Sequence, residues 1–228
     1  MTKADGRYIL ISKSGLKGRL IKMNLFGLYR LLELKQYFVF SLKDLSTFFP
    51  GEKRENLKKI TYRWRKNGRI ASLKRGLFEI TFPNQRAIPD LYIANRLYEP
   101  SYVSLETALS KYSIIPEVSM AVTSITTKPT RKFKNKHGLF IYRTIRPCAF
   151  SGYFVEKHRG FNLLIAEPEK ALIDYLYFAG YHNKNCDLGQ ARLNKDIIAK
   201  LDKRKLKKYA QLYNLNLRRA YAYLWRPA

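Results

Sequence analysis

"EKRENLKKITYRWRKNGRIASLKRG", residues 52–76, combines heavy positive charge with a regular spacing of apolar residues. It holds ten Lys and Arg residues but only two Glu residues. Because an α-helix advances about 100° per residue, four of its less polar residues fall on one stripe. We therefore predict an amphipathic helix over residues 52–66 that packs on this stripe and ends at Asn67-Gly68. The four residues of the stripe are Leu57, Ile60, Thr61 and Trp64.

The outward face of this predicted helix carries almost only positive charge. Lys59 and Arg63 stand four residues apart, and like charges at that spacing destabilise a helix by about 0.2–0.5 kcal/mol. A DNA duplex would compensate for this cost, because each phosphate that a Lys or Arg neutralises releases counterions. An ordinary solvated charged face is the alternative that the sequence leaves open.

The segments around this helix predict a winged helix-turn-helix. Two short helices are expected before it, over residues 26–35 and 42–49, and Pro50-Gly51 separates the second from the third. Two short strand-like runs follow within residues 69–82, joined at Gly76, which suits a tight hairpin. Three short helices followed by a hairpin is the element order of this DNA-binding fold.

The helix and the hairpin tip supply the candidate DNA-binding residues. In a helix-turn-helix, the first residues of the second helix face the base edges of the major groove. Arg can read guanine, Asn adenine and Glu cytosine, while Lys and Arg further along are placed for phosphates. The candidates are Arg54, Glu55, Asn56, Lys58, Lys59, Tyr62, Arg63, Lys66, Arg69, Lys74 and Arg75.

The charge of the whole chain of 228 residues favours an anionic partner. Lys and Arg number 44 against 17 Asp and Glu, a net charge of +27, and 46% of the residues are hydrophobic. Residues 1–82 carry +13 and residues 83–228 carry +14, so both halves are cationic. Nucleic acid is the first partner that such a charge indicates, and an anionic membrane surface the second.

The sequence also predicts the setting of the protein. The first residues, "MTKADGRYILISKSG", lack the apolar stretch of a signal peptide. No segment reaches the roughly 18–20 apolar residues that span a bilayer. We expect a soluble, cytoplasmic protein without a membrane association.

The two prolines of "PNQRAIPD", residues 83–90, indicate a domain boundary. We predict an α+β protein with a DNA-binding domain over residues 1–85 and a mixed α/β domain over residues 86–228. In the second domain, we expect a helix capped by Ser104, and strands over residues 122–128 and 139–145 paired across the turn "KNKHG". A further strand is expected over 161–166, then a helix that starts at Pro168, and mostly helix from 194 to 225.

Pieces of the second domain resemble the AbiEi family, the antitoxins of AbiE-type toxin–antitoxin systems linked to abortive phage infection. The resembling pieces are "SYVSLETAL" at 101–109, "VTSITTK" at 122–128 with the later "YR" at 142–143, and "PEKALID" at 168–174. The resemblance implies an N-terminal domain that binds inverted repeats upstream of its own operon and represses it. It also implies a C-terminal domain that neutralises a nucleotidyltransferase-like toxin, AbiEii, without a tight, lasting complex. The first 23 residues do not match the family pattern.

A basic run in the second domain is a further candidate surface. Its cations can form one face that contacts RNA, DNA or an acidic toxin surface. The alternative is a solvated hairpin whose lysines protect a sheet edge. The residues are Lys128, Arg131, Lys132, Lys134, Lys136, Arg143 and Arg146.

The sequence holds little that indicates catalysis, so we predict no enzyme, no cofactor and no metal. It has no phosphate loop, no nucleophile elbow and no His pair at metal-ligand spacing. Two alternatives remain. One is a nucleic-acid-processing enzyme using Glu167, Glu169 and Lys170, and the other is a transcriptional regulator whose second domain senses a ligand.

Overall fold

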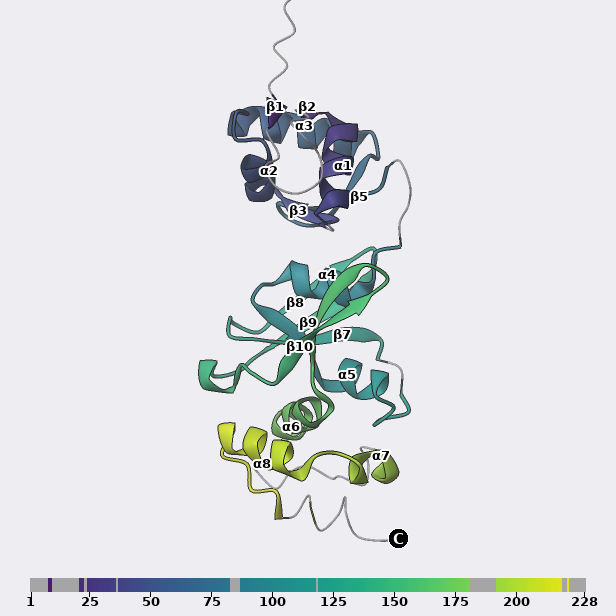
Figure 1. The fold of residues 1–228 in the computed structure, drawn as a ribbon, viewed down its shortest axis with the longest axis vertical. Coiled ribbons are helices and arrows are strands. Elements are labelled where there is room, and N and C mark those ends of the chain that lie inside the picture. The colour runs from purple at the N-terminus through teal and green to yellow at the C-terminus, as the bar shows by residue number, and fades with distance from the viewer. Residues whose placement is uncertain are drawn as a thin grey trace, which may run out of the picture. The chain divides into compact units, whose positions relative to one another are not determined.

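The protein is represented by a computed structural model, which describes residues 8–9, 21–22, 24–35, 37–82, 87–117, 119–180, 192–218 and 221. The chain divides into two compact units, residues 1–88 and 89–228 (Figure 1). The described residues form eight α-helices together with β-sheets, so the predicted α+β class is confirmed. The predicted boundary at residues 85 and 86 falls in segment 83–86, which lies outside the described residues.

The first unit combines three helices with a three-stranded antiparallel sheet. The strands follow the order β3-β5-β4, so the first strand pairs with the last. Leu28, Phe40, Leu45 and Leu57, from three helices and one strand, are fully buried in its core. The elements are α1 (Leu25–Leu34), β3 (Val39–Ser41), α2 (Leu42–Phe48), α3 (Arg54–Lys66), β4 (Ile70–Lys74) and β5 (Leu77–Ile80). A two-stranded antiparallel pair, β1 (Tyr8–Ile9) and β2 (Ile21–Lys22), precedes them.

Local side-chain bonds determine where the first two helices begin. The Asn24 side chain accepts a hydrogen bond of 2.7 Å from the Gly27 backbone N–H at the start of α1. Ser41 and Asp44 form a capping box at the start of α2, in which each side chain bonds the backbone of the other residue. Ser41 is therefore the N-cap of α2, which begins at Leu42 as predicted.

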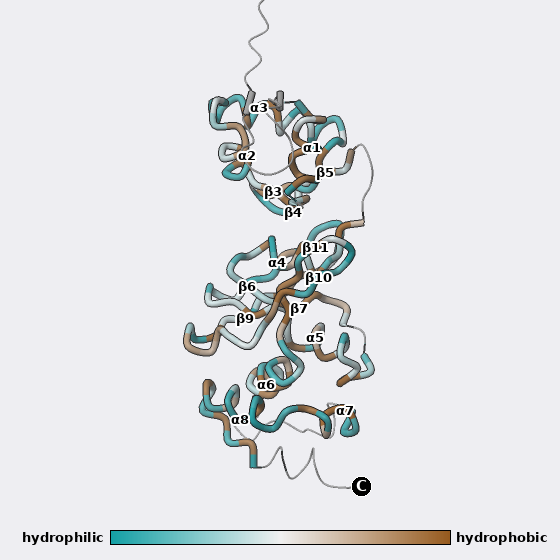
Figure 2. Tube along the Cα trace, viewed as in Figure 1, coloured by the Kyte–Doolittle hydropathy of each residue, from teal (hydrophilic) through white to brown (hydrophobic). Residues whose placement is uncertain are grey.

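The second unit is built on a six-stranded mixed sheet with the order β10-β11-β6-β7-β9-β8. Its hydrophobic stretches gather at the centre of the sheet, around β7 and β11 (Figure 2). The elements before the last helices are α4 (Asp90–Leu97), β6 (Ser101–Val103), α5 (Leu105–Lys111), β7 (Ala121–Thr126), β8 (Arg131–Asn135), β9 (Gly138–Thr144), the 3₁₀ turn η1 (Pro147–Ala149), β10 (Tyr153–His158) and β11 (Phe161–Ala166). The helices that follow are α6 (Pro168–Phe178), α7 (Lys195–Ala199) and α8 (Lys203–Leu212).

Helices cover both faces of this sheet (Figure 1). On one face, the hydroxyl of Tyr142 in β9 donates a 2.6 Å hydrogen bond to the carbonyl of Ala94 in α4. On the other, the hydroxyl of Tyr102 in β6 donates to Asp174 in α6. Tyr102 is in register with Ile125 of β7, which is in register with Arg143 of β9. Tyr142 is the neighbour of Arg143, and neighbouring residues of a strand point to opposite faces. Helices α4 and α6 therefore lie on opposite sides of the central strands.

The predicted pairing of strands 122–128 and 139–145 across a turn is wrong. β7 and β9 are neighbours, but they run parallel, whereas the turn at residues 136–137 joins β9 to the antiparallel strand β8. The sequence of β8, "RKFKN", reads as a solvated basic run because Phe133 is its one apolar residue. The charges of this edge strand thus concealed the extra strand. Helix α4 was also not predicted.

The remaining predicted elements of the second unit agree with the structure apart from small differences in extent. The strand at 161–166 matches β11, and Pro168 occupies the first turn of α6. On α6, Leu172 and Leu176 are buried, while Tyr175 and Ala179 are half-buried. The predicted helical region 194–225 holds two described helices, α7 and α8.

A fully buried carboxylate joins four parts of the second unit. Asp174 is 0% exposed and accepts hydrogen bonds from the Tyr102 hydroxyl (3.1 Å), the Ser104 hydroxyl (2.8 Å), the Tyr213 hydroxyl and the Lys170 ammonium. Ser104 precedes α5, but its hydroxyl bonds Asp174 and makes no cap, which corrects the predicted role. Burial lowers the pKa of Lys170, against the opposing effect of the Asp174 charge. The buried centre of Asp174 and its four donors therefore connects β6, α5, α6 and the segment after α8.

We predict that Asp174→Ala lowers the free energy of unfolding by about 3–5 kcal/mol, because Lys170 is left buried without its counter-charge. Lys170→Met combined with Asp174→Leu should cost less than Asp174→Ala alone, since no buried charge remains. Hydrogen exchange of the α6 amides in increasing urea measures both effects.

The matched control is Lys205→Ala, which removes an ion pair with Glu167 that is partly open to solvent. Such a pair contributes at most about 1 kcal/mol. An Asp174→Ala protein as stable as this control would contradict the central role of the buried carboxylate.

Candidate nucleic-acid interface

The inner face of α3 is the predicted stripe. Leu57 and Thr61 are 0% and 4% exposed, and Ile60 and Trp64 are half-buried. The Thr61 hydroxyl donates a 2.8 Å hydrogen bond to the Leu57 carbonyl, so its polar group is satisfied within the helix. The helix begins at Arg54, two residues later than predicted, and Asn67 is its C-cap. This packing determines which side chains α3 presents to solvent.

The outer face of α3 is a continuous exposed surface with one acid. Within the part of the chain that the structure describes, none of its Lys or Arg residues forms an ion pair. The structure thus brings together on one helix eight of the predicted DNA-binding residues, all exposed. They are Arg54, Glu55, Asn56, Lys58, Lys59, Tyr62, Arg63 and Lys66.

Tyr62 is the aromatic centre of this face. Its side chain is 58% exposed, and the guanidinium carbon of Arg65 lies 5.7 Å from its ring centroid. Lys58, Lys59, Tyr62 and Arg63 line a shallow depression on the helix surface. A tyrosine among cations can stack on a ligand ring or donate its hydroxyl to a phosphate.

Sequence reasoning missed Arg65. The spacing of three residues from Tyr62 would have indicated it, because residues three apart on a helix are neighbours. A second depression, lined by Lys58, Thr61, Tyr62, Arg65 and Phe78, shows that β5 lies beside this flank of α3. The sheet and the basic helix therefore meet at the edge of the exposed face.

The β4–β5 turn presents the predicted hairpin tip. Gly76 has a φ of +78°, a conformation that residues with a Cβ rarely adopt, so a glycine is required there. Arg75 is exposed at the turn, and Lys74 is half-buried. Arg69 is half-buried, and its guanidinium carbon lies 4.0 Å from the ring centroid of Phe82. Arg69 is thus held against its own unit, and Arg75 is the most accessible cation of the tip.

The seven candidate cations of the second unit are exposed, but they do not all lie on one face. Lys128 and Arg131 lie over the Tyr98 ring, 5.4 and 5.7 Å from its centroid, on the α4 side of the sheet. Lys132 and Lys134 alternate with Arg131 along β8 and point to the opposite side. The alternation of the edge strand therefore divides the basic run.

The last cations of the basic run, Lys136, Arg143 and Arg146, also do not share one face with Arg131. Arg143 lies 5.8 Å from the ring centroid of Phe178 in α6, on the side opposite to Arg131. Arg146 donates a 3.3 Å hydrogen bond to the carbonyl of Leu212, and Lys136 is exposed in the β8–β9 turn. Arg143 and Arg146 are thus partly engaged by α6 and the end of α8.

The acids considered for a nuclease site make structural contacts. Burial alone would raise the pKa of Glu167, but hydrogen bonds from Lys205 and Tyr209 outweigh burial. The pKa of Glu167 is therefore below its ordinary value. Glu169 accepts a 3.0 Å bond from the Asp202 backbone N–H, and Lys170 belongs to the buried centre. The described residues contain no group of three or more His, Cys, Asp or Glu that could hold a metal. Glu167 and Glu169 thus tie α6 to α8.

No model of a known protein family matches the chain, and no curated protein matches it. Among the described helices, none has the length and the apolar character needed to cross a membrane.

Proposed function

We propose that this protein is a DNA-binding transcriptional regulator whose first unit is a winged helix-turn-helix. The element order α1-β3-α2-α3-β4-β5, with the sheet order β3-β5-β4, supports this fold. In this proposal, α3 is the recognition helix and the β4–β5 turn is the wing.

The observation that carries the proposal is the outer face of α3. Lys59 and Arg63 repel each other, and no described acid pairs with either of them. Phosphates on either side of a groove would offset this repulsion and release counterions. Arg54 and Asn56 in the first turn are exposed side chains of the types that read guanine and adenine.

We further propose that the protein is an antitoxin that represses its own operon and neutralises a neighbouring nucleotidyltransferase-like toxin. The support is the resemblance of residues 101–145 and 166–178 to the AbiEi family. Those residues include Tyr102, Ser104, Lys170 and Asp174, four of the five members of the buried centre. The resembling residues thus include most of the buried centre and also most of the exposed candidate cations, from Lys128 to Arg143.

We expect Arg54→Ala combined with Lys59→Ala to weaken binding to the duplex upstream of the chain's own gene by about 100-fold. One base contact and one phosphate contact of about 1–2 kcal/mol each give this factor. Fluorescence anisotropy with a labelled duplex measures it. Lys43→Ala, which removes an exposed cation from α2, should leave the affinity within about twofold.

Lys59→Glu separates loss of binding from loss of folding. It should abolish DNA binding and leave the melting temperature close to that of the wild type, because the opposite-charge pair that it forms with Arg63 offsets the like-charge pair that it forms with Glu55. Unchanged DNA affinity in both α3 variants would remove α3 as the recognition helix.

Coexpression tests the antitoxin proposal. The neighbouring gene should stop growth when it is induced alone, and the full chain should restore growth. The Lys59→Glu chain should still restore growth from an independent promoter, because the proposal assigns neutralisation to the second unit. A harmless neighbour, or no rescue by any version, would refute the antitoxin function and leave the DNA-binding proposal standing.

A further inference from the structure

Strand β10 forms one edge of the six-stranded sheet, and its outer side is open. Its first three residues are large and exposed: Tyr153, Phe154 and Val155 are 36%, 41% and 55% exposed. Folded proteins usually block an edge strand with charges, a proline, a bulge or a covering segment. Strand β10 contains no proline, and its register on β11 is regular over its whole length. This edge is therefore open to pairing with another strand.

The opposite edge of the sheet, strand β8, is blocked by charge. It carries three cations and no acid in five residues, so a second copy of this chain, with its own net charge of +27, would be repelled there. Strand β10 carries one acid and one lysine, and the acid, Glu156, pairs with Lys111 of α5 at 3.0 Å. The edge at β10 thus leaves one unpaired cation, Lys157, within the described residues. A second cationic chain meets less repulsion at β10 than at β8.

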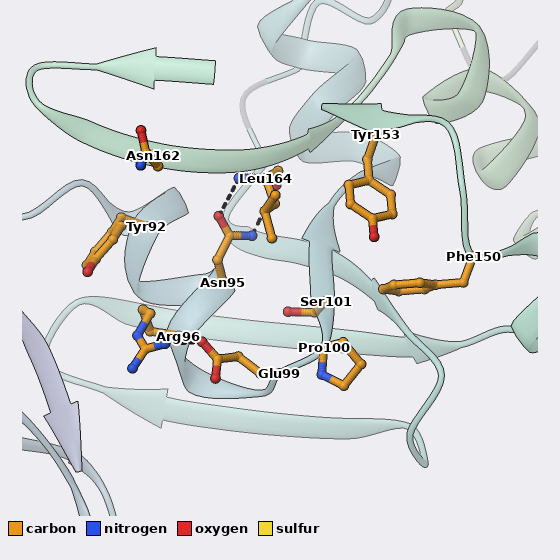
Figure 3. Close-up of a pocket in the computed structure, with 10 residues that line it drawn as sticks. All are labelled: Tyr92, Asn95, Arg96, Glu99, Pro100, Ser101, Phe150, Tyr153, Asn162 and Leu164. Carbon is orange, nitrogen blue, oxygen red and sulfur yellow. Dashed lines mark hydrogen bonds and ion pairs between the residues drawn. The ribbon is translucent and has the colours of Figure 1, made fainter. Parts of the chain in front are cut away.

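The backbone of β10 directs hydrogen-bonding groups outward at every second residue. Val155 lies opposite Leu164 of β11, whose N–H and C=O are bonded by the Asn95 side chain at 2.8 and 3.0 Å, on the side away from β10 (Figure 3). Opposite residues of an antiparallel pair either bond each other or both turn away, in alternation. The N–H and C=O of Val155 therefore point outward, as do those of Tyr153 and Lys157. Among the described residues, none bonds these outward groups.

The outward groups are symmetric about Val155, so a second β10 can pair with the first. A two-fold axis at Val155 makes the strands antiparallel and places Tyr153 opposite Lys157 of the second copy, which suits a cation beside a ring. Glu156 then lies opposite Phe154, and no like charges face each other. A shift of the axis to Glu156 would place two carboxylates opposite each other, and a shift to Phe154 would leave Lys157 beyond the paired strand. Strand β10 is therefore complementary to itself in one register.

We propose that two copies of this chain pair through β10 and join their sheets into one continuous sheet across a two-fold axis. The pairing covers Phe154 on one face of the sheet and Val155 on the other. Because the same surface is used on both copies, the assembly closes at two. One strand pair buries less than a standard interface, so we expect a dissociation constant of about 10–100 μM. The dimer does not depend on DNA binding by α3, so either proposal can fail without the other.

Sedimentation velocity of the nuclease-treated full chain tests the dimer, over about 5 to 500 μM. We expect a reversible equilibrium between monomer and dimer. The association should strengthen from about 0.1 to 0.5 M salt, because salt screens the repulsion between two cationic chains. Copies bridged by residual nucleic acid would instead separate as salt rises. A monomer at every concentration, an assembly larger than a dimer, or an association that weakens with salt would overturn the proposal.

Val155→Lys should weaken the dimer by about tenfold or more, because it places two cations opposite each other at the axis. The matched control is Leu34→Lys, which adds the same charge at a side chain of equal exposure, 56%, on α1 of the first unit. Val155→Pro is a second test. It removes an N–H that points outward, so the pairing of β10 with β11 is kept while the dimer is lost. The melting temperature of each variant checks its folding.

Amide hydrogen exchange, followed by nuclear magnetic resonance, identifies the strand that pairs. The amides of Tyr153, Val155 and Lys157 should exchange at least about tenfold more slowly at 500 μM than at 20 μM chain, because only the dimer bonds them. The amides of Phe154 and Glu156, which point to β11, should not depend on concentration. The proposal is also overturned if the outward amides show no such dependence, or if Leu34→Lys weakens the dimer as much as Val155→Lys.

Discussion

The buried carboxylate of Asp174 constrains the second unit more than any other group. A charged oxygen at 0% exposure is tolerable only when donors surround it, and these come from residues as distant in the chain as Tyr102 and Tyr213. The sheet, α6 and the segment after α8 must therefore all be in place before the charge is compensated.

The packing of α8 also constrains the loop that contains Gly152. A Cβ on Gly152 would lie 2.7 Å from the Tyr209 ring of α8, so the chain passes there only as glycine. That loop brings the rings of Phe150 and Tyr153 against Tyr102.

The first unit shows the opposite use of charge. Its core is mostly apolar, although Glu79 of β5 is 2% exposed, and α3 carries a group of exposed cations that form no ion pair within the described residues. Local stability is lower than a mixed-sign helix would give, and a polyanion would remove the deficit on binding. The second unit thus compensates the buried charge of Asp174 with its own donors, whereas the first unit leaves the surface charge of α3 to a partner.

Sequence patterns identified what depends on neighbours along the chain. The capping box at Ser41, the inner stripe of α3 and the proline at the start of α6 are local features, and each was predictable. Features set by distant residues were not. The hydroxyl of Ser104 looked like a helix cap but serves Asp174, 70 positions away. Strand β8 was not predicted as a strand, because an edge strand tolerates charged residues on both faces and its sequence shows no apolar alternation. The pairing of β6 with β11 at Val103 and Ile165 is likewise encoded by no periodicity.

The salt dependence of duplex binding tests the central claim, that the outer face of α3 binds phosphates. Lys58, Lys59, Arg63 and Lys66 give four candidate contacts, so the logarithm of the association constant should fall against the logarithm of salt with a slope of about −4. Lys59→Ala should make this slope shallower by about one. A flat dependence, or a slope that Lys59→Ala leaves unchanged, would contradict the account.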